Sequence, residues 1–252
     1  MKAVLVATSI AFLGALALAG SPAATPDARV YELRITTATP GKLDAVVAYF
    51  RDLCKLHEKH GITTVGYWTA EPDDGKLYSI LAYASHEAAA KASKAVAADP
   101  KWKEVNKRIM ANGGNLVATV KSTSLKLTDY SPPVKAPAGN HVYELRTYTA
   151  RKHSEAALHA RFRDHTMKLF EKHGMTNVGY WAPQESFEGG DTLVYLLAHK
   201  NMDAAKNSWA AFRADPDWVA VKKASEKDGW TLTVPDGVKS VYLRSTDYFP
   251  MK

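Results

Sequence analysis

One ordered set of short motifs occurs twice in this chain of 252 residues, and this repeat limits the folds that it can adopt. Residues 30–36 read VYELRIT and residues 142–148 read VYELRTY. Further matches join residues 60–68 with 173–181, 99–102 with 215–218, and 125–132 with 243–250. The separation between matching residues drifts from 112 to 118, so small insertions distinguish the two copies. Each copy has roughly 110 residues, enough to bury a core of its own.

Each copy shows the same order of strand and helix patterns. In the first copy, strand patterns occupy residues 30–36, 64–69, 77–84 and 116–128. A helix with apolar side chains at helical spacing begins near Lys42 and ends at His60-Gly61. Ser85 is a typical cap for a second helix, and Asp99-Pro100 for a third. The second copy repeats this order, so both are predicted to be βαββαβ units.

The βαββαβ order is that of a ferredoxin-like unit, in which the helices cover one face of the sheet. Two such units in one chain can press their uncovered faces together. We therefore predict an α+β fold: two tandem ferredoxin-like units packed sheet to sheet as an intrachain dimeric α+β barrel. The first unit is placed at residues 29–130 and the second at 141–249. The linker between them, residues 131–140, contains three prolines, which favour a stiff, extended segment.

The N-terminus has the pattern of a secretory signal peptide. Lys2 is followed by an almost entirely apolar run to Ala19, and small residues continue to Ala24. We predict a signal peptide within residues 1–24, cleaved after Ala19 or Ala24, and an exported protein that is periplasmic or secreted. The alternative is an uncleaved anchor. The apolar run of about 17 residues is at the short limit for a membrane span, so no stable span is expected after cleavage.

Charge and cysteine usage exclude few functions. The net charge is +7, but lysines are scattered among acidic residues, which is typical of a solvated basic surface. Attraction to an anionic membrane surface or an acidic ligand is the alternative. No motif suggests nucleic-acid binding. Cys54 is the only cysteine and forms no intrachain disulfide; it lies on an apolar helix face and is predicted to be buried.

Several stretches resemble the NIPSNAP family. They are the Tyr-Glu-Leu-Arg strands, the FRDHT segment at residues 162–166, and the EKHGM segment at 171–175 that leads to Gly179-Tyr180-Trp181. Both copies take part, although residues 51–54 of the first lack the histidine found at His165 and are one residue shorter. The resemblance implies a dimeric α+β barrel. Eukaryotic members are associated with mitochondria, vesicular trafficking and mitophagy signalling. The barrel superfamily includes cofactor-free monooxygenases, haem enzymes and lyases, so the fold alone assigns no function.

The charged residues of the repeated strand are the first candidate site. Glu32 and Arg34 are two apart and share a strand face, as do Glu144 and Arg146. We expect the apolar strand face to meet the helices and these four charges to point into the barrel. There they either form an ion-pair network that fixes how the halves dock, or bind a carboxylate or enolate with Glu as base.

Histidines and aromatic pairs are further candidates. His165 is predicted at the core edge, as a structural histidine or, together with Glu144 and Arg146, as a catalytic residue. His60 and His173 suit the C-terminal ends of helices. Tyr67-Trp68 and Tyr180-Trp181 lie on strands, so one ring of each pair should join the helix core and the other the lumen, as packing or as a ligand wall.

The sequence leaves the activity open. It has no phosphate loop, Rossmann glycine pattern, HExxH or nucleophile elbow, and we expect no metal and no cofactor; a haem ligand at His173 or His199 lacks an attachment motif. The leading hypothesis is an exported protein that binds a small apolar or anionic ligand, or a protein partner, through its barrel. The alternative is a cofactor-independent monooxygenase or isomerase acting in the lumen. Homo-oligomerisation stays open.

Overall fold

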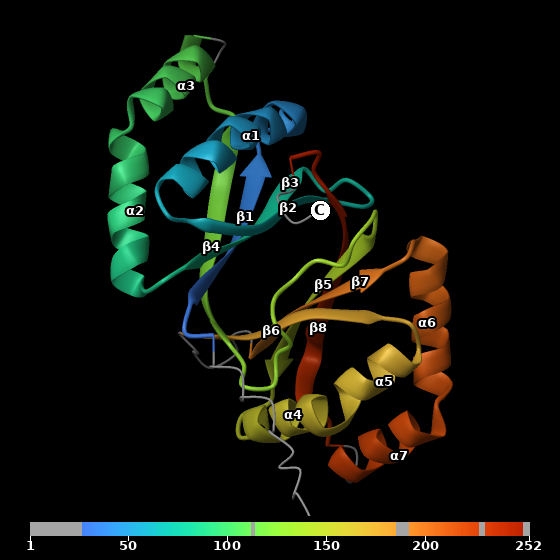
Figure 1. Cartoon of the computed structure of the whole chain (residues 1–252). Helices are drawn as coiled ribbons and strands as arrows, with labels where there is room; N and C mark the ends of the chain where they lie inside the picture. The colour runs from blue at the N-terminus through green and yellow to red at the C-terminus, as the bar shows by residue number, and fades with distance from the viewer. Residues whose placement is uncertain (1–26, 112–113, 185–191, 227–229, 249–252) are drawn as a thin grey trace, which may run out of the picture.

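The computed structural model describes residues 27–111, 114–184, 192–226 and 230–248 (Figure 1). The predicted signal peptide, residues 1–24, lies outside the described residues, as does most of the turn predicted after Pro183. Among the described residues, no helix has the length and apolar character needed to cross a membrane.

The predicted order of elements is confirmed in both repeats. Repeat one comprises β1 (Val30–Ala38), α1 (Leu43–Lys59), β2 (Thr63–Ala70), β3 (Lys76–Tyr83), α2 (His86–Ala98), α3 (Pro100–Ala111) and β4 (Val117–Leu127). Repeat two comprises β5 (Val142–Ala150), α4 (Glu155–Arg161), the π-helical turn η1 (Phe162–Thr166), α5 (Met167–Lys172), β6 (Thr176–Pro183), β7 (Leu193–His199), α6 (Met202–Ala214), α7 (Pro216–Ser225) and β8 (Thr233–Ser245).

The residues that the sequence predicts to begin and end the helices do so in the structure. Gly61 follows α1 with a φ of +76°, a left-handed conformation that glycine adopts at little cost. The Ser85 side chain accepts a hydrogen bond from the backbone at the start of α2. The helix-ending histidine bonds to the aspartate that starts the next short helix: His60 Nε2 lies 2.8 Å from Asp99, and repeat two has the same pair.

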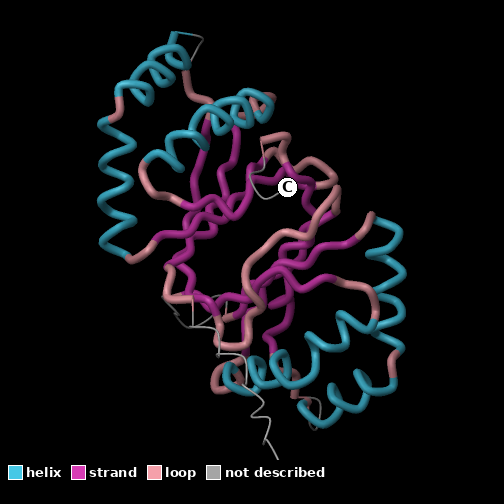
Figure 2. Tube along the Cα trace, in the orientation of Figure 1, coloured by secondary structure: helices cyan, strands magenta, loops and turns pink. Residues whose placement is uncertain are grey.

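The eight strands of the described residues form one closed barrel in the order β1-β3-β2-β8-β5-β7-β6-β4. Each repeat contributes four neighbouring strands, so the predicted sheet-to-sheet barrel is confirmed. Edge strands also pair across the repeats, which the sequence did not predict: β2 pairs β8, and β4 pairs β6, over three residue pairs each. The helices of the two repeats lie outside the strands, on opposite sides of the molecule (Figure 2).

Large apolar side chains fill the barrel lumen. Trp68 of repeat one contacts Tyr143 of repeat two, and Tyr31 contacts Trp181, each with ring centroids 5.7 Å apart. The linker takes part as well: Ala136 is buried in this cluster, so the segment is a packed part of the barrel and not only a spacer. A packed lumen leaves little room for a ligand there.

The charged strand residues face the other way from the prediction. Glu32, Arg34, Glu144 and Arg146 point outward beneath the helices, and Trp209 of α6 donates to Glu144 at 2.6 Å. The expectation that they face the lumen is therefore wrong. Both faces of each sheet are buried, so alternation separates two faces without showing which one meets the helices. The apolar face lines the lumen because no water or helix is there to satisfy charges.

One extra residue distinguishes the first helical stretch of repeat two. In repeat one, α1 is a regular helix; in repeat two, the π-helical turn η1 interrupts it. A single inserted residue in a helix is commonly accommodated as a π-bulge. The residue that repeat one lacks near positions 51–54 is thus the insertion that η1 absorbs. The buried Thr166 hydroxyl donates to the Arg161 carbonyl at 3.0 Å across this turn.

Candidate functional site

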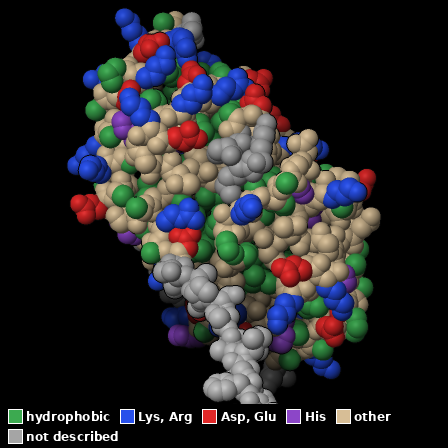
Figure 3. Space-filling model, viewed as in Figure 1, with side chains coloured by type: hydrophobic (Ala, Val, Ile, Leu, Met, Phe, Trp, Pro, Cys, Tyr) green, Lys and Arg blue, Asp and Glu red, His purple; other side chains and the backbone are tan. Residues whose placement is uncertain are grey.

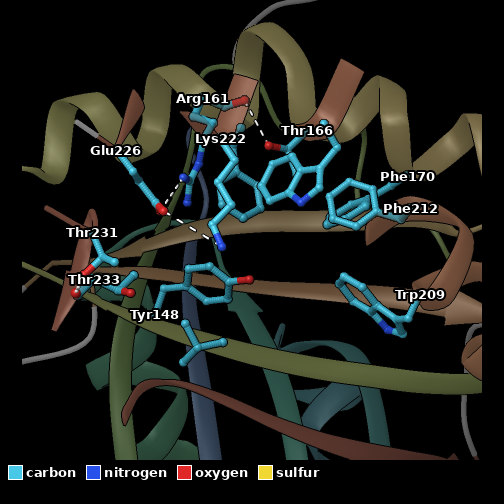
Figure 4. A pocket seen from close by; sticks show the side chains of 13 residues that line it. Tyr148, Arg161, Thr166, Phe170, Trp209, Phe212, Lys222, Glu226, Thr231 and Thr233 are labelled. Atoms are coloured by element: carbon cyan, nitrogen blue, oxygen red, sulfur yellow. Dashed lines mark hydrogen bonds and ion pairs between the residues drawn. The ribbon is translucent and has the colours of Figure 1, made fainter. Parts of the chain in front are cut away.

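A cavity of about 200 Å³ lies between the helices and the outer sheet face of repeat two (Figure 4). Polar groups gather at one end of it and aromatic rings at the other. The wall residues are Tyr148, Arg161, Phe162, Thr166, Phe170, Trp209, Phe212, Trp218, Lys222, Glu226, Thr231, Thr233 and Val238. They come from β5, α4, η1, α5, α6, α7 and β8 and the segment before it, so only the folded repeat brings them together.

Arg161 is the most deeply buried charge in the cavity wall. Only 6% of its side chain is exposed. Its Nη1 donates to Glu226 at 2.8 Å and to Ser225 at 3.2 Å. Its Nε is buried and has no hydrogen-bond partner among the described residues. Lys222 extends toward the same end, with its Nζ 4.0 Å from Glu226. Two cations thus share one carboxylate.

Below Tyr148, a buried polar network supports the cavity floor. Arg146 Nη2 donates to the Tyr148 hydroxyl at 3.4 Å, and the Tyr195 hydroxyl donates to it at 3.2 Å. Burial raises the pKa of Tyr195 well above its usual value, so this phenol stays protonated. With two donors already placed on its oxygen, the Tyr148 hydroxyl can direct its own hydrogen elsewhere. Figure 4 shows this hydroxyl within the space that the wall residues enclose.

The glutamate of this network is held ionised. Glu144 is fully buried and accepts hydrogen bonds from His199, Trp209, Ser240 and Arg146. Burial alone would raise its pKa, but these donors and the positive charge of Arg146 outweigh burial and lower the pKa to about 2. The guanidinium of Arg146 lies 4.5 Å from the centroid of the Trp209 ring. The indole therefore separates Arg146 from the cavity.

Several predicted site residues lie away from this cavity. Trp68 and Trp181 are in the lumen, whereas Tyr67 and Tyr180 pack beneath the helices. The prediction that each pair divides between the two cores is confirmed. His165 is exposed on η1, so its predicted place at the core edge is wrong: the extra residue in the π-turn rotates it outward. Cys54 is buried, as predicted.

The remaining predicted residues lie outside the wall of this cavity. Glu144 and Arg146 lie beneath the cavity floor, and Glu32 and Arg34 hold the equivalent positions in repeat one. His199 is buried against Glu144, and His173 pairs with Asp215. Among the described residues, no group of three or more His, Cys, Asp or Glu is placed to hold a metal ion.

Sequence reasoning missed Arg161 and the cavity role of Tyr148. A signal for Arg161 exists in the repeat itself. Counting from the matched strands, Arg161 stands where repeat one has Tyr49, one residue before a phenylalanine in both copies. Both side chains lie over the equivalent tryptophan of the short helix, Trp218 or Trp102. The change from Tyr49 to Arg161 at this inward position is the signal that a comparison of the two copies could have found.

A family model described as NIPSNAP matches residues 31–132 and 143–233. The chain belongs to the NIPSNAP family. Each NIPSNAP match falls on one repeat, so the family unit is present twice. No curated protein matches this NIPSNAP chain in a sequence search.

Solved structures share the whole two-repeat fold. A candidate monooxygenase from Fusobacterium nucleatum subsp. nucleatum has 12% identity and a TM-score of 0.61, covering 86% of this chain and 92% of its own. A candidate monooxygenase from Lactobacillus acidophilus has 11% identity and a TM-score of 0.55, covering 86% and 93%. An anthrone oxidase-like protein has 11% identity and a TM-score of 0.53, covering 87% and 92%. At such identities the similarity shows the fold alone.

Proposed function

We propose that this NIPSNAP protein binds a small aromatic anion, of one ring, in the cavity of repeat two. The observation that carries the proposal is Arg161, a buried guanidinium whose Nε lacks a partner among the described residues, at the polar end of an aromatic-walled cavity. A buried, unsatisfied donor costs about 1–3 kcal/mol, which a ligand acceptor would recover.

The size of the cavity supports a single ring. Its volume of about 200 Å³ is somewhat larger than the roughly 150 Å³ that admits benzene in an engineered protein cavity. Phe162, Phe170 and Phe212 offer ring faces and edges to such a ligand. Aromatic pairs contribute about 0.5–1.5 kcal/mol beyond the area that they bury.

The charge of the wall supports an anion. Arg161 and Lys222 carry two positive charges against the single negative charge of Glu226. An anionic group beside Arg161 would balance the excess, and a guanidinium can bind a carboxylate through two nitrogens. The Tyr148 hydroxyl could donate to a second polar group of the ligand.

Calorimetric titration with benzoate tests the proposal, with the neutral analogue benzyl alcohol as comparison. We expect Arg161→Met to weaken benzoate binding roughly 10- to 100-fold, because a hydrogen bond to a charged group contributes about 1.5–3 kcal/mol. The matched control is Arg163→Met, which removes a half-exposed arginine from the same helical stretch. No binding of benzoate by the folded wild-type protein, or equal weakening by both variants, would refute the proposal.

A second candidate function is cofactor-independent oxygenation or isomerisation of the ligand in this cavity, not in the packed lumen. It is favoured by the Tyr148 hydroxyl at the floor and by the shared fold of proteins described as candidate monooxygenases. Oxygen uptake with 4-hydroxybenzoate would distinguish it: consumption that Tyr148→Phe abolishes supports catalysis. Saturable binding without uptake or chemical change of the ligand supports binding alone.

We also propose that the protein is exported, which rests on the apolar run and small residues of segment 1–24. N-terminal sequencing of the full-length gene product, isolated from a secretion-competent host, tests this. A mature chain beginning at Gly20 or Thr25 is expected, whereas a chain that retains the residues before Gly20 would contradict cleavage.

A further inference from the structure

Repeat one contains its own cavity at the equivalent place. It has a volume of about 210 Å³ and lies between α1, α2 and α3 and the outer face of its sheet. Its walls differ in kind from those of repeat two. Leu53, Ile62 and Val96 provide aliphatic surface beside Tyr83 and Trp102, and Arg34 belongs directly to the wall. The wall of repeat two instead contains three phenylalanines, Phe162, Phe170 and Phe212.

A single substitution between the repeats opens Arg34 to this cavity. Ser93 lies eight residues after the Ser85 cap of α2, and Trp209 lies eight residues after the Asn201 cap of α6. In repeat two, the Trp209 ring covers Arg146. In repeat one, the small and exposed Ser93 leaves Arg34 uncovered.

The guanidinium of Arg34 has bonding capacity left. Its Nε and Nη2 donate to Glu32 at 2.9–3.1 Å, so Nη1 and its two hydrogens are not used in this pair. The Tyr83 hydroxyl donates to the same glutamate at 2.8 Å. Glu32 is therefore already well satisfied. The Tyr83 hydroxyl also interacts with Arg34, but the two hydrogens of Nη1 leave the partly exposed guanidinium able to bind a further acceptor.

His57 completes the polar end of the cavity. Its Nδ1 lies 2.9 Å from the Tyr67 hydroxyl, so this contact fixes the imidazole ring. Burial, together with the positive charge of Arg34, lowers the pKa of His57 to about 4, although Glu32 opposes this shift. At neutral pH the imidazole is therefore uncharged. It can donate a hydrogen bond to a ligand, while Arg34 remains the group that binds an anionic charge.

We propose that the repeat-one cavity is a second and separate ligand site, specific for a short aliphatic carboxylate. The carboxylate would accept from Arg34 Nη1, and the alkyl chain would contact Leu53, Ile62 and Val96. This site differs from the aromatic site of repeat two in its walls and in the position of its arginine, which comes from the sheet and not from a helix. It does not depend on the function proposed for repeat two.

The test is a methyl-resolved NMR titration of the full chain with isovalerate, using benzoate as the second probe. Methyl groups of Leu53 and Val96 report on repeat one, and Val238 reports on repeat two. We expect saturable shifts at Leu53 and Val96 with isovalerate. Isovalerate shifts confined to Val238, or no saturable shifts, would overturn the second site. If benzoate causes no shift at Val238 while isovalerate still shifts Leu53 and Val96, only the function proposed for repeat two is refuted.

The decisive variant is Ser93→Trp, which places an indole over Arg34 as repeat two does over Arg146. It is expected to fold, because Ser93 is exposed on α2, and to abolish the isovalerate shifts at Leu53. Lys94→Trp adds the same side chain at the neighbouring exposed position and should bind as the wild type does. Arg34→Lys keeps the charge but removes the Nη1 donors, and should weaken binding about tenfold. Unchanged binding in Ser93→Trp would overturn the proposal.

Discussion

The two repeats share their supporting residues and differ in their cavity residues. The Glu–Arg pair of the first strand, the helix caps, the His–Asp bond and the lumen tryptophan occur in both. The positions in or next to the cavities have changed as follows: Tyr49 to Arg161, His57 to Phe170, Ser79 to Tyr195, and Ser93 to Trp209. The barrel therefore constrains one set of positions, while the space between helices and sheet tolerates change in another.

The shared Glu–Arg pair shows how its surroundings set its role. In repeat two, side-chain exposure is 1% for Glu144 and 14% for Arg146. In repeat one, it is 17% for Glu32 and 24% for Arg34. The same two residue types thus form a sealed network beneath Trp209 and an accessible binding group beneath Ser93. The first should matter chiefly for stability and the second for binding.

The largest expected effect tests this division of roles. Arg146→Ala should lower the free energy of unfolding by about 3–5 kcal/mol, because it leaves the buried Glu144 without its cation. Arg34→Ala should cost less, about 1–3 kcal/mol, because water can reach Glu32. Urea denaturation of both variants measures the difference. An unchanged unfolding midpoint for Arg146→Ala would show that the pair is not structural and would favour a functional role for it.

A smaller effect concerns the loss of stability at acidic pH. The pKa of His57 is about 4 in the folded protein and about 6.5 unfolded, so above pH 6.5 the imidazole is neutral in both states and its titration does not reduce stability. As the pH falls from about 6.5 to 4, the unfolded chain binds the proton first and up to about 3 kcal/mol is lost. The groups facing His57 are Arg34, which lowers its pKa, and Glu32, which raises it.

The double variant His57→Phe/Tyr67→Phe tests this loss. It copies the phenylalanine of repeat two and avoids leaving the Tyr67 hydroxyl unpaired. The slope of unfolding free energy against pH between 6.5 and 4 should be shallower than in the wild type, and Phe170→Leu in repeat two should leave that slope unchanged. Parallel pH profiles for the wild type and the double variant would exclude His57 as the source.

Much of the fold was predictable because its signals are local. Turn glycines, Asp-Pro helix starts and the period of apolar residues depend on neighbours in sequence, and the repeat supplied each signal twice. The direction of the Glu144 side chain was not predictable. The alternation of residues separates the two faces of a strand but does not show what packs against either face. The cavity was not predictable either, because Tyr148, Arg161 and Trp209 meet only through packing of distant segments. Comparing the two copies position by position would have marked Arg161.

The smallest expected effect tests whether the shared positions are equivalent. Lys59 bonds to Asp99 at 2.6 Å and Lys172 to Asp215 at 2.8 Å, and both lysine side chains are more than half exposed. Because each aspartate keeps its histidine partner and water screens the pairs, each Lys→Ala substitution should cost only about 0.2–1 kcal/mol. The two losses should agree within error in urea denaturation and should shrink at 1 M salt. A large loss in one repeat only would mean that this shared position has diverged in role as the cavity positions have, and that the barrel no longer constrains the two copies alike.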